Sequence, residues 1–171
     1  MESKERRKLI EEMLKCSNIP QKGHILSEKL GVTRQIIVKD IAMLRAEGKN
    51  IIATPEGYIM PNYEKNHIRK VIAVSHTPND IEDELMSIVK FGGTVEDVIV
   101  EHALYGEIRG MLMIKSYYDV QNFIKRINEY KAEPLLVLTG GVHLHTVVCE
   151  NDECMKNILN ELKSKGYLIN E

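Results

Sequence analysis

The sequence contains no tryptophan, and its aromatic residues make up only 5% of 171 residues. Its longest aliphatic runs are about four residues, at Val71–Val74 and Leu135–Leu138, whereas a transmembrane helix needs roughly twenty. The charged start, Met1–Arg7, leads into no apolar segment, so we expect no signal peptide and no membrane partner. Hydrophobic residues at 43% and charged residues at 28% are normal for a globular protein and argue against disordered, collagen-like and coiled-coil classes.

Cysteine is also scarce. Cys16, Cys149 and Cys154 are odd in number, and their spacing fits no zinc ribbon. We therefore expect a free buried thiol at each position and a reduced, cytoplasmic compartment.

Positive and negative charges are unevenly distributed along the chain. Residues 1–62 carry 11 Lys and Arg against 8 Asp and Glu, whereas residues 63–171 carry 12 against 17. This asymmetry predicts two domains with different partners, at residues 1–61 and 67–171, joined by a polar linker at Pro61–Asn66. The positive excess is by itself weak support for nucleic-acid binding.

The first sixty residues show the periodicity of a winged helix-turn-helix. We expect three helices and then two short strands, at residues 3–16, 25–30, 33–47, 51–53 and 58–60. Gly31 is placed to end the second helix in the left-handed conformation, and Thr33 is placed to cap the third. This order of elements predicts a helix-turn-helix followed by a wing.

The outer face of the third predicted helix carries hydrogen-bond donors. Thr33, Arg34, Gln35 and Lys39 lie on this face. The major groove of DNA admits one helix, and Arg and Gln can form paired hydrogen bonds with base edges. We therefore predict that these four residues contact double-stranded DNA. Asp40 would be repelled by phosphate, so we expect it to pair with a neighbouring Arg or Lys.

The remaining residues repeat one design. Three helices are predicted to begin at Thr77, Ser116 and Asn151, each with a capping residue and an apolar stripe. The strand-like runs that flank these helices are Val71–His76, Val95–His102, Met111–Ile114, Leu135–Leu138, Val142–Cys149 and Tyr167–Ile169. This threefold β-α-β quasi-repeat predicts an α/β sandwich with helices packed on one face of a mixed sheet, so the whole chain is expected to be α+β.

A set of histidines and one glutamate in the second domain could bind a metal. His143 and His145 share one face of an alternating strand, roughly 6–7 Å apart along the chain. His76 ends an earlier strand, and Glu84 lies beside the apolar stripe of the next helix, where a carboxylate needs a partner. Three imidazole nitrogens and one carboxylate oxygen suit Zn²⁺, Ni²⁺, Co²⁺ or Fe²⁺, whereas Ca²⁺ and Mg²⁺ prefer more oxygen ligands.

The other candidates near this set are less defined. Glu82 and Asp83 are expected to point away from the apolar stripe and to need no partner, and His24 and His67 are expected at the surface. For His102 three roles stay open: contact with a ligand, a place in the metal shell, or capping of its own strand.

The matching segments that identify a family are Val32–Ile41, Leu44–Gly48, Gly57–Tyr58, Ser75–Thr77, Glu84–Leu85, Gly92–Gly93, Asp97–His102, Tyr105–Gly106 and Leu138–Thr146. In these segments the sequence resembles the niacin-responsive transcription repressors, which join a biotin-repressor-type helix-turn-helix to a 3H domain named for its histidines. The match covers essentially the whole chain, and Gly141–Thr146 is its most specific part.

The resemblance implies a repressor of niacin-uptake and NAD-biosynthesis genes, with nicotinic acid as co-repressor and no enzymatic activity. It also implies a divalent metal, nickel or zinc, held by His76, Glu84, His143 and His145. Nicotinate carries a carboxylate and a pyridine nitrogen. We expect the metal to accept one of these groups, and His102 or Arg109, near Tyr105, to bind the other. Repressors of this size bind pseudo-palindromes as dimers, so a homodimer through the second domain is expected.

Several alternatives stay open. The first domain could be a helical hairpin for protein contact, with Arg34 and Lys39 only solvated. The two-apart histidines could be polar residues of a half-exposed strand. The metal itself could be the effector, or it could be structural beside a different organic ligand. A metal-dependent enzyme is less favoured, because cupins present their histidine pair first and three helices here interrupt the barrel that they require.

Overall fold

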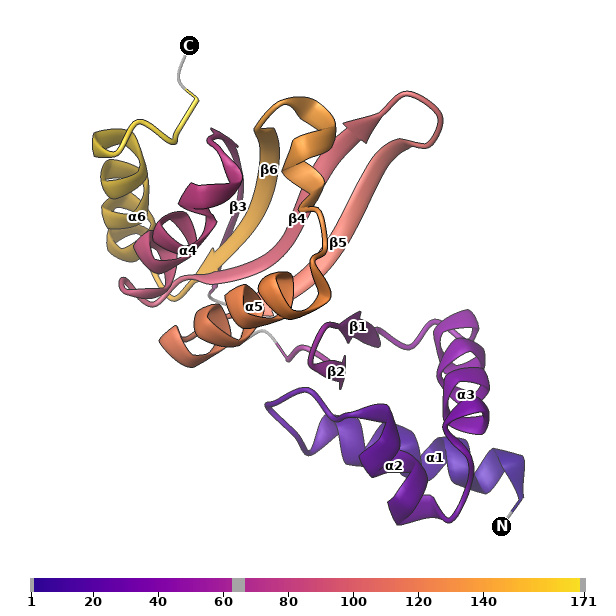
Figure 1. The fold of residues 1–171 in the computed structure, drawn as a ribbon. Coiled ribbons are helices and arrows are strands. Elements are labelled where there is room, and N and C mark those ends of the chain that lie inside the picture. The colour runs from indigo at the N-terminus through magenta and orange to yellow at the C-terminus, as the bar shows by residue number, and fades with distance from the viewer. Residues whose placement is uncertain (1, 63–66, 170–171) are drawn as a thin grey trace. The chain divides into compact units, whose positions relative to one another are not determined.

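The computed structural model describes residues 2–62 and 67–169. The chain divides into two compact units, Met1–Tyr63 and Glu64–Glu171 (Figure 1). Residues 63–66 of the predicted linker lie outside the described residues. Within the described residues, no helix is long and apolar enough to cross a membrane.

The first unit has the predicted three helices and hairpin. These elements are α1 (Ser3–Lys15), α2 (Gly23–Leu30), α3 (Arg34–Ala46), β1 (Ile52–Thr54) and β2 (Gly57–Ile59). Gly31 ends α2 with φ of 64°, in the left-handed region that glycine adopts readily. The Thr33 side chain accepts a hydrogen bond from the backbone N–H of Ile36 and so caps α3 as predicted. The winged helix-turn-helix prediction is confirmed.

A buried ion pair joins α1 to α3. Arg6 Nε lies 2.5 Å from Asp40 Oδ2, and the two residues are only 8% and 3% exposed. Arg7 Nη1 lies 3.8 Å from the other carboxylate oxygen. Asp40 therefore has the structural role that its sequence context predicts.

The second unit has a four-stranded sheet and three α-helices. Its elements are β3 (Ile68–Ser75), α4 (Ile81–Val89), β4 (Thr94–His102), β5 (Gly106–Ile114), α5 (Tyr117–Tyr130), β6 (Val142–Cys149) and α6 (Asp152–Ser164). One 3-10 turn at Pro78–Asp80 precedes α4. The strand order is β3-β6-β4-β5. The α+β class is confirmed.

The sheet is antiparallel where a mixed sheet was expected. Every pair of neighbouring strands, β3 with β6, β6 with β4 and β4 with β5, is antiparallel. Because β3 and β4 are each antiparallel to β6, they run in the same direction, but β6 lies between them. The unit β3-α4-β4 is thus a split β-α-β unit, and its parallel strands are not neighbours.

Two predicted strands are wrong. Leu135–Thr139 forms a 3-10 helix, η2, that starts after Pro134. A four-residue apolar run has too few residues for its periodicity to separate a strand from a helical turn. Leu168 makes only an isolated antiparallel bridge with Val74, so the segment after α6 adds no full strand. The threefold quasi-repeat therefore fails in its second and third copies.

The three helices cover one face of the sheet (Figure 1). Their apolar stripes pack with alternate residues of the strands in one core that includes Val74, Ile88, Val120, Val147 and Ile158. All three cysteines are free; Cys149 is buried as expected and Cys154 partly so, but Cys16 is exposed because it lies just after α1.

We predict that the Arg6–Asp40 pair stabilises the first unit specifically. Asp40→Ala should cost roughly 3–5 kcal/mol, because it leaves a buried guanidinium uncompensated. Amide hydrogen exchange in α1 and α3 should then speed up by about a hundredfold or more, while exchange in β3 to β6 should not change. Glu28→Ala, at an exposed position of α2, is the control. If α1 and α3 of Asp40→Ala exchanged their amide hydrogens as slowly as in the wild type, the stabilising role of the Arg6–Asp40 pair would be contradicted.

Candidate functional site

The predicted DNA-contacting residues form an exposed polar face on α3. Arg34, Gln35 and Lys39 are exposed, and Thr33 is exposed at the helix start. Residues 33–39 contain no acidic residue, and the carboxylate of Asp40 is turned into the unit. The face is therefore positively charged and free to meet an anionic partner, which is what reading a major groove requires.

In the second unit, strand and helix periodicity bring the metal-ligand candidates together. Along β6, His143 and His145 are buried on the helix-covered side, whereas Val142 and Leu144 point to the opposite side. His76 directly follows β3, whose residue Val74 pairs with His143.

Glu84 comes from a helix rather than from the sheet. It lies in the first turn of α4. There the positive end of the helix dipole favours a carboxylate.

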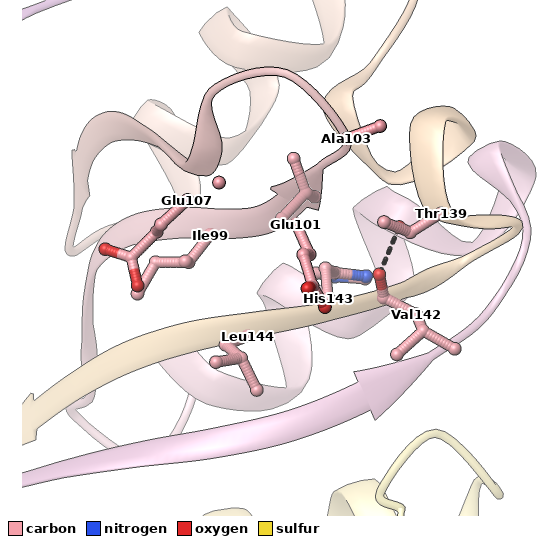
Figure 2. A pocket seen from close by; sticks show the side chains of 10 residues that line it. Ile99, Glu101, Ala103, Glu107, Thr139, Val142, His143 and Leu144 are labelled. Carbon is pink, nitrogen blue, oxygen red and sulfur yellow. Dashed lines mark hydrogen bonds between the residues drawn. The ribbon is translucent and has the colours of Figure 1, made fainter.

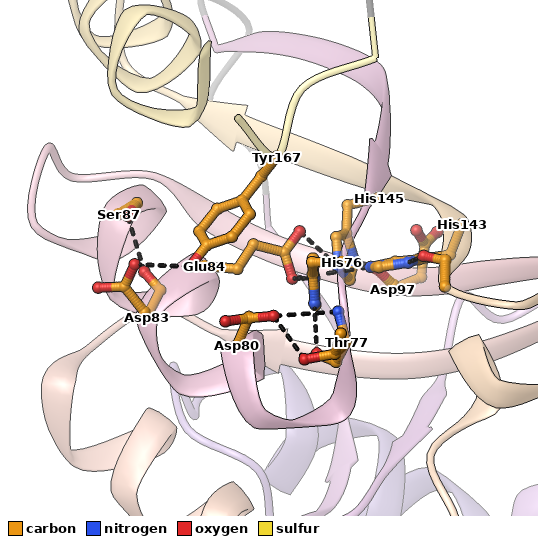
Figure 3. Close-up of polar contacts among 11 residues, drawn as sticks. His76, Thr77, Asp80, Asp83, Glu84, Ser87, Asp97, His143, His145 and Tyr167 are labelled. Atoms are coloured by element: carbon orange, nitrogen blue, oxygen red, sulfur yellow. Dashed lines mark hydrogen bonds and ion pairs between the residues drawn. The ribbon is translucent and has the colours of Figure 1, made fainter. Parts of the chain in front are cut away.

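His76, Glu84 and His143 converge on one point, and His145 approaches the other oxygen of Glu84 beside them (Figure 3). Glu84 Oε2 lies 2.7 Å from His76 Nε2 and 3.6 Å from His143 Nε2, and Glu84 Oε1 lies 3.3 Å from His145 Nε2. In the described part of the chain, one potential ligand atom each from His76, Glu84 and His143 lie within 4.8 Å of one another. Side chains that are distant in sequence thus form a single buried cluster.

The remaining ring nitrogen of each histidine faces a backbone carbonyl oxygen. His76 Nδ1 is 2.8 Å from Thr77 O, His143 Nδ1 is 2.8 Å from Gly141 O, and His145 Nδ1 is hydrogen-bonded to Asp97 O. A carbonyl oxygen only accepts, so each Nδ1 carries the proton and donates it. The three Nε2 atoms face Glu84 and would serve as ligands once they give up their protons to an incoming ion, in the arrangement that fixes the tautomer of metal-binding histidines.

The Glu84 carboxylate is 1% exposed, and its Oε1 makes no hydrogen bond. Burial by itself would raise the pKa of this group, but His145 and the other two imidazoles outweigh burial and hold the pKa well below its usual range. Burial likewise opposes the charged forms of His76 and His145, but Glu84 raises the pKa of both. A buried, ionised carboxylate with an unsatisfied oxygen and three aligned imidazoles fits a bound cation.

Gly141 lies between His76 and His143 and lets them approach each other. Its φ is 104°, and a Cβ at this position would lie 2.6 Å from His76 O. Any larger residue would therefore push β6 away from the end of β3. Gly141 is therefore required for the close backbone approach of β6 to the end of β3.

A bulge in β4 supports His145. Near Asp97 the register of β4 shifts against both of its neighbouring strands, β5 and β6. The buried Asp97 carboxylate accepts hydrogen bonds from Thr146 N, Thr146 Oγ1 and Arg109 Nη1, at 2.8, 2.9 and 2.9 Å. These bonds hold the peptide whose carbonyl oxygen binds His145. The sequence pattern does not single out Asp97, because a strand bulge leaves little periodicity signal.

An open cavity of about 800 Å³ reaches His143 (Figure 2). The backbone pairing of β4 with β6 stops at Ile99 and Leu144, and beyond that point the two strands form the walls. The lining residues are Ile99, Val100, Glu101, Ala103, Gly106, Glu107, Thr139, Val142, His143 and Leu144. The cavity thus combines apolar walls, two carboxylates and one candidate metal ligand.

The predicted effector residues do not line this cavity. His102 Nδ1 accepts hydrogen bonds from the N–H groups of Leu104 and Tyr105 in the β4–β5 turn, which is the capping role left open above. Tyr105 is exposed at the turn. Arg109 binds Asp97 and Glu107. The structure therefore brings the metal candidates together but keeps these three residues apart from them.

Comparisons with known proteins agree with this division of the chain. An HTH domain family matches residues 6–59, and the 3H domain family matches residues 69–171. The chain is 47% identical to "Probable transcription repressor NiaR" of Thermotoga maritima, over 98% of this chain and 95% of that protein. It is 37% identical to "Transcription repressor NadR" of Bacillus subtilis, over 92% of this chain and 89% of that protein.

A third relative is not named as a repressor and matches a smaller part of the chain. An uncharacterized protein of Methanothermus fervidus is 31% identical over 57% of this chain and 16% of that protein. The two full-length relatives are named as regulators, as expected for a chain that is not an enzyme. The chain therefore belongs to the family of transcription repressors in which a helix-turn-helix domain is followed by a 3H domain.

Proposed function

We propose that this chain is a repressor whose affinity for operator DNA is set by a divalent transition metal and nicotinic acid bound to its second unit. The observation that carries the sensing half is the Glu84 carboxylate, buried among three imidazoles with one oxygen unsatisfied. The proposed ligands are His76, Glu84, His143 and His145. The DNA-contacting residues are Thr33, Arg34, Gln35 and Lys39, and the chain acts as a homodimer.

The donor set favours Ni²⁺ or Zn²⁺. Three nitrogen atoms and one carboxylate oxygen match borderline transition metals and offer too few oxygens for Ca²⁺. The ion would neutralise Glu84 and give the three Nε2 atoms a common partner. Because an ion competes with protons for the imidazoles, its affinity should fall as the pH drops.

Nicotinic acid is proposed as the effector from the family resemblance and from the cavity beside His143. Apolar walls such as Val100 and Leu144 suit a flat heteroaromatic ring. The carboxylates of Glu101 and Glu107 would repel the nicotinate carboxylate, so we propose that this group points away from them and toward the ion. His102 and Tyr105 would then act on the effector only if the β4–β5 turn moves, and Arg109 only if it leaves its ion pairs with Asp97 and Glu107.

The proposal is tested by measuring DNA binding in four conditions: without ligand, with the ion alone, with nicotinate alone and with both. A duplex enriched from a random library by the wild-type protein should bind most tightly when both Ni²⁺ or Zn²⁺ and nicotinate are present. By linkage, the duplex should raise nicotinate affinity by the same factor. Nicotinamide is the matched control ligand. Full affinity with the ion alone would instead identify a metal sensor, and equal affinity in all four conditions would contradict co-repression.

We predict that His143→Ala/His145→Ala loses the ion and the nicotinate response while the protein stays folded. Two of four ligands disappear, and the remaining pair cannot hold a transition metal tightly. Metal content by mass spectrometry should fall from about one ion per chain to nearly none. His24→Ala, at an exposed position of α2, should keep the ion. A double variant that still responds to nicotinate would exclude the metal from sensing.

We predict that Arg34→Ala weakens binding to the selected duplex by roughly 5- to 150-fold, the effect of losing a bidentate base contact. Fluorescence anisotropy against the selected and a scrambled duplex measures it, and specificity should fall together with affinity. Lys163→Ala, exposed on α6, controls for the loss of one positive charge. Unchanged binding by Arg34→Ala would show that another surface of the protein recognises the duplex.

A further inference from the structure

Tyr167 contacts the two elements that supply His76 and Glu84. Its ring packs edge-on against the His76 imidazole, with 5.2 Å between ring centroids. Its hydroxyl donates a 2.9 Å hydrogen bond to Asp83, the residue before Glu84. Its backbone oxygen accepts a 2.9 Å hydrogen bond from the N–H of Ser75, the residue before His76. One residue after α6 thus holds the neighbours of two candidate ligands (Figure 3).

The segment Lys165–Ile169, which we name the C-terminal strap, lies along the outer edge of β3. β3 is the edge strand of the sheet. Ile169 N donates to Ala73 O at 2.9 Å, and Leu168 forms a bridge with Val74. These bonds pair the last residues of β3 on the side where an edge strand would otherwise present free backbone groups.

Lys165 attaches the strap to α4. Its Nζ lies 2.7 Å from Asp83 Oδ1 and 3.0 Å from Ser87 Oγ. Asp83 therefore receives both a positive charge and the Tyr167 hydroxyl, although its place in the sequence suggested that it needs no partner. The strap is bonded to β3 through its backbone and to α4 through its side chains.

The two halves of the candidate metal centre differ in how they are supported. His143 and His145 lie on β6, an inner strand of the sheet, and both residues are paired with β3. His76 directly follows the edge strand β3 and Glu84 lies on α4, and the strap crosses from this strand to this helix. The strap therefore supports the half of the centre that His76 and Glu84 form.

We propose that Tyr167 is a positioning residue for the metal centre, and that the strap sets the spacing of His76 and Glu84 and thereby slows ion release. The inference rests on the proposed function, because it requires an ion at the cluster. Tyr167 itself offers no ligand atom, since its hydroxyl is bonded to Asp83. Residues that orient metal ligands in this way typically contribute 10- to 100-fold to metal affinity.

Ion release from the full chain tests the inference. After loading with Co²⁺ or Zn²⁺, the rate of removal by excess chelator and the competition Kd are measured for the wild type and for Tyr167→Leu, which lacks both the ring and the hydroxyl. Release should be roughly 10- to 100-fold faster and the Kd correspondingly weaker. The visible absorption spectrum of bound Co²⁺ should also change, a signature that general destabilisation does not produce in a folded protein.

Two milder variants keep the test decisive if Tyr167→Leu does not fold. Tyr167→Phe removes the hydrogen bond to Asp83, and Asp83→Ala removes this bond together with the Lys165 ion pair. Each variant should speed release by roughly twofold or more. The double variant should be less impaired than independent effects would predict, because the Tyr167–Asp83 hydrogen bond is lost in both single variants.

Tyr130→Leu, at a 75% exposed position at the end of α5, is the matched control and should release the ion at the wild-type rate. Folded Tyr167 variants that keep the wild-type release rate and Co²⁺ spectrum would overturn the positioning role and leave the metal site standing. A wild-type chain that takes up no ion would overturn the metal site and this inference together.

Discussion

The carboxylate of Glu84 is the constraint around which the second unit is organised. It is a charge with almost no access to water, and moving such a group into a protein interior costs several kcal/mol unless partners compensate. Three imidazoles surround it, yet one of its oxygens makes no hydrogen bond. Apolar residues would fill this position at lower cost, which supports our proposal that the carboxylate and the imidazoles share a cation.

Each element around the carboxylate has a geometric reason to be there. The period of two along β6 places both of its histidines on one face. Gly141 lets β6 approach the end of β3 closely enough for His76 to join them. The Thr77–Asp80 hydrogen bonds start the turn before α4 and so set where Glu84 enters. Backbone carbonyls hold all three rings, and the rings therefore need no rearrangement to present their Nε2 atoms.

Local chemistry predicted much of this arrangement, and non-local pairing accounts for the rest. Strand alternation and helix periodicity were enough to predict the positions of the histidines and of Glu84. The residue preferences of helix ends were enough to predict the caps at Gly31 and Thr33. The sequence does not reveal that β6 inserts between β3 and β4, so the antiparallel sheet was missed. Asp97 and Tyr167 were missed for the same reason, because their roles arise from contacts 48 or more residues away. The apolar run at 135–138 was misassigned because it is too short to show a period.

The most direct test of the account is X-ray absorption spectroscopy of the protein loaded with Ni²⁺ or Zn²⁺. The account predicts about one ion per chain, with three imidazole nitrogens and one carboxylate oxygen near 2.0–2.2 Å, and any further ligand drawn from solvent or effector. Loss of two imidazole contributions in the His143→Ala/His145→Ala protein would assign the ligands. An all-oxygen shell, or no bound ion at all, would contradict the account.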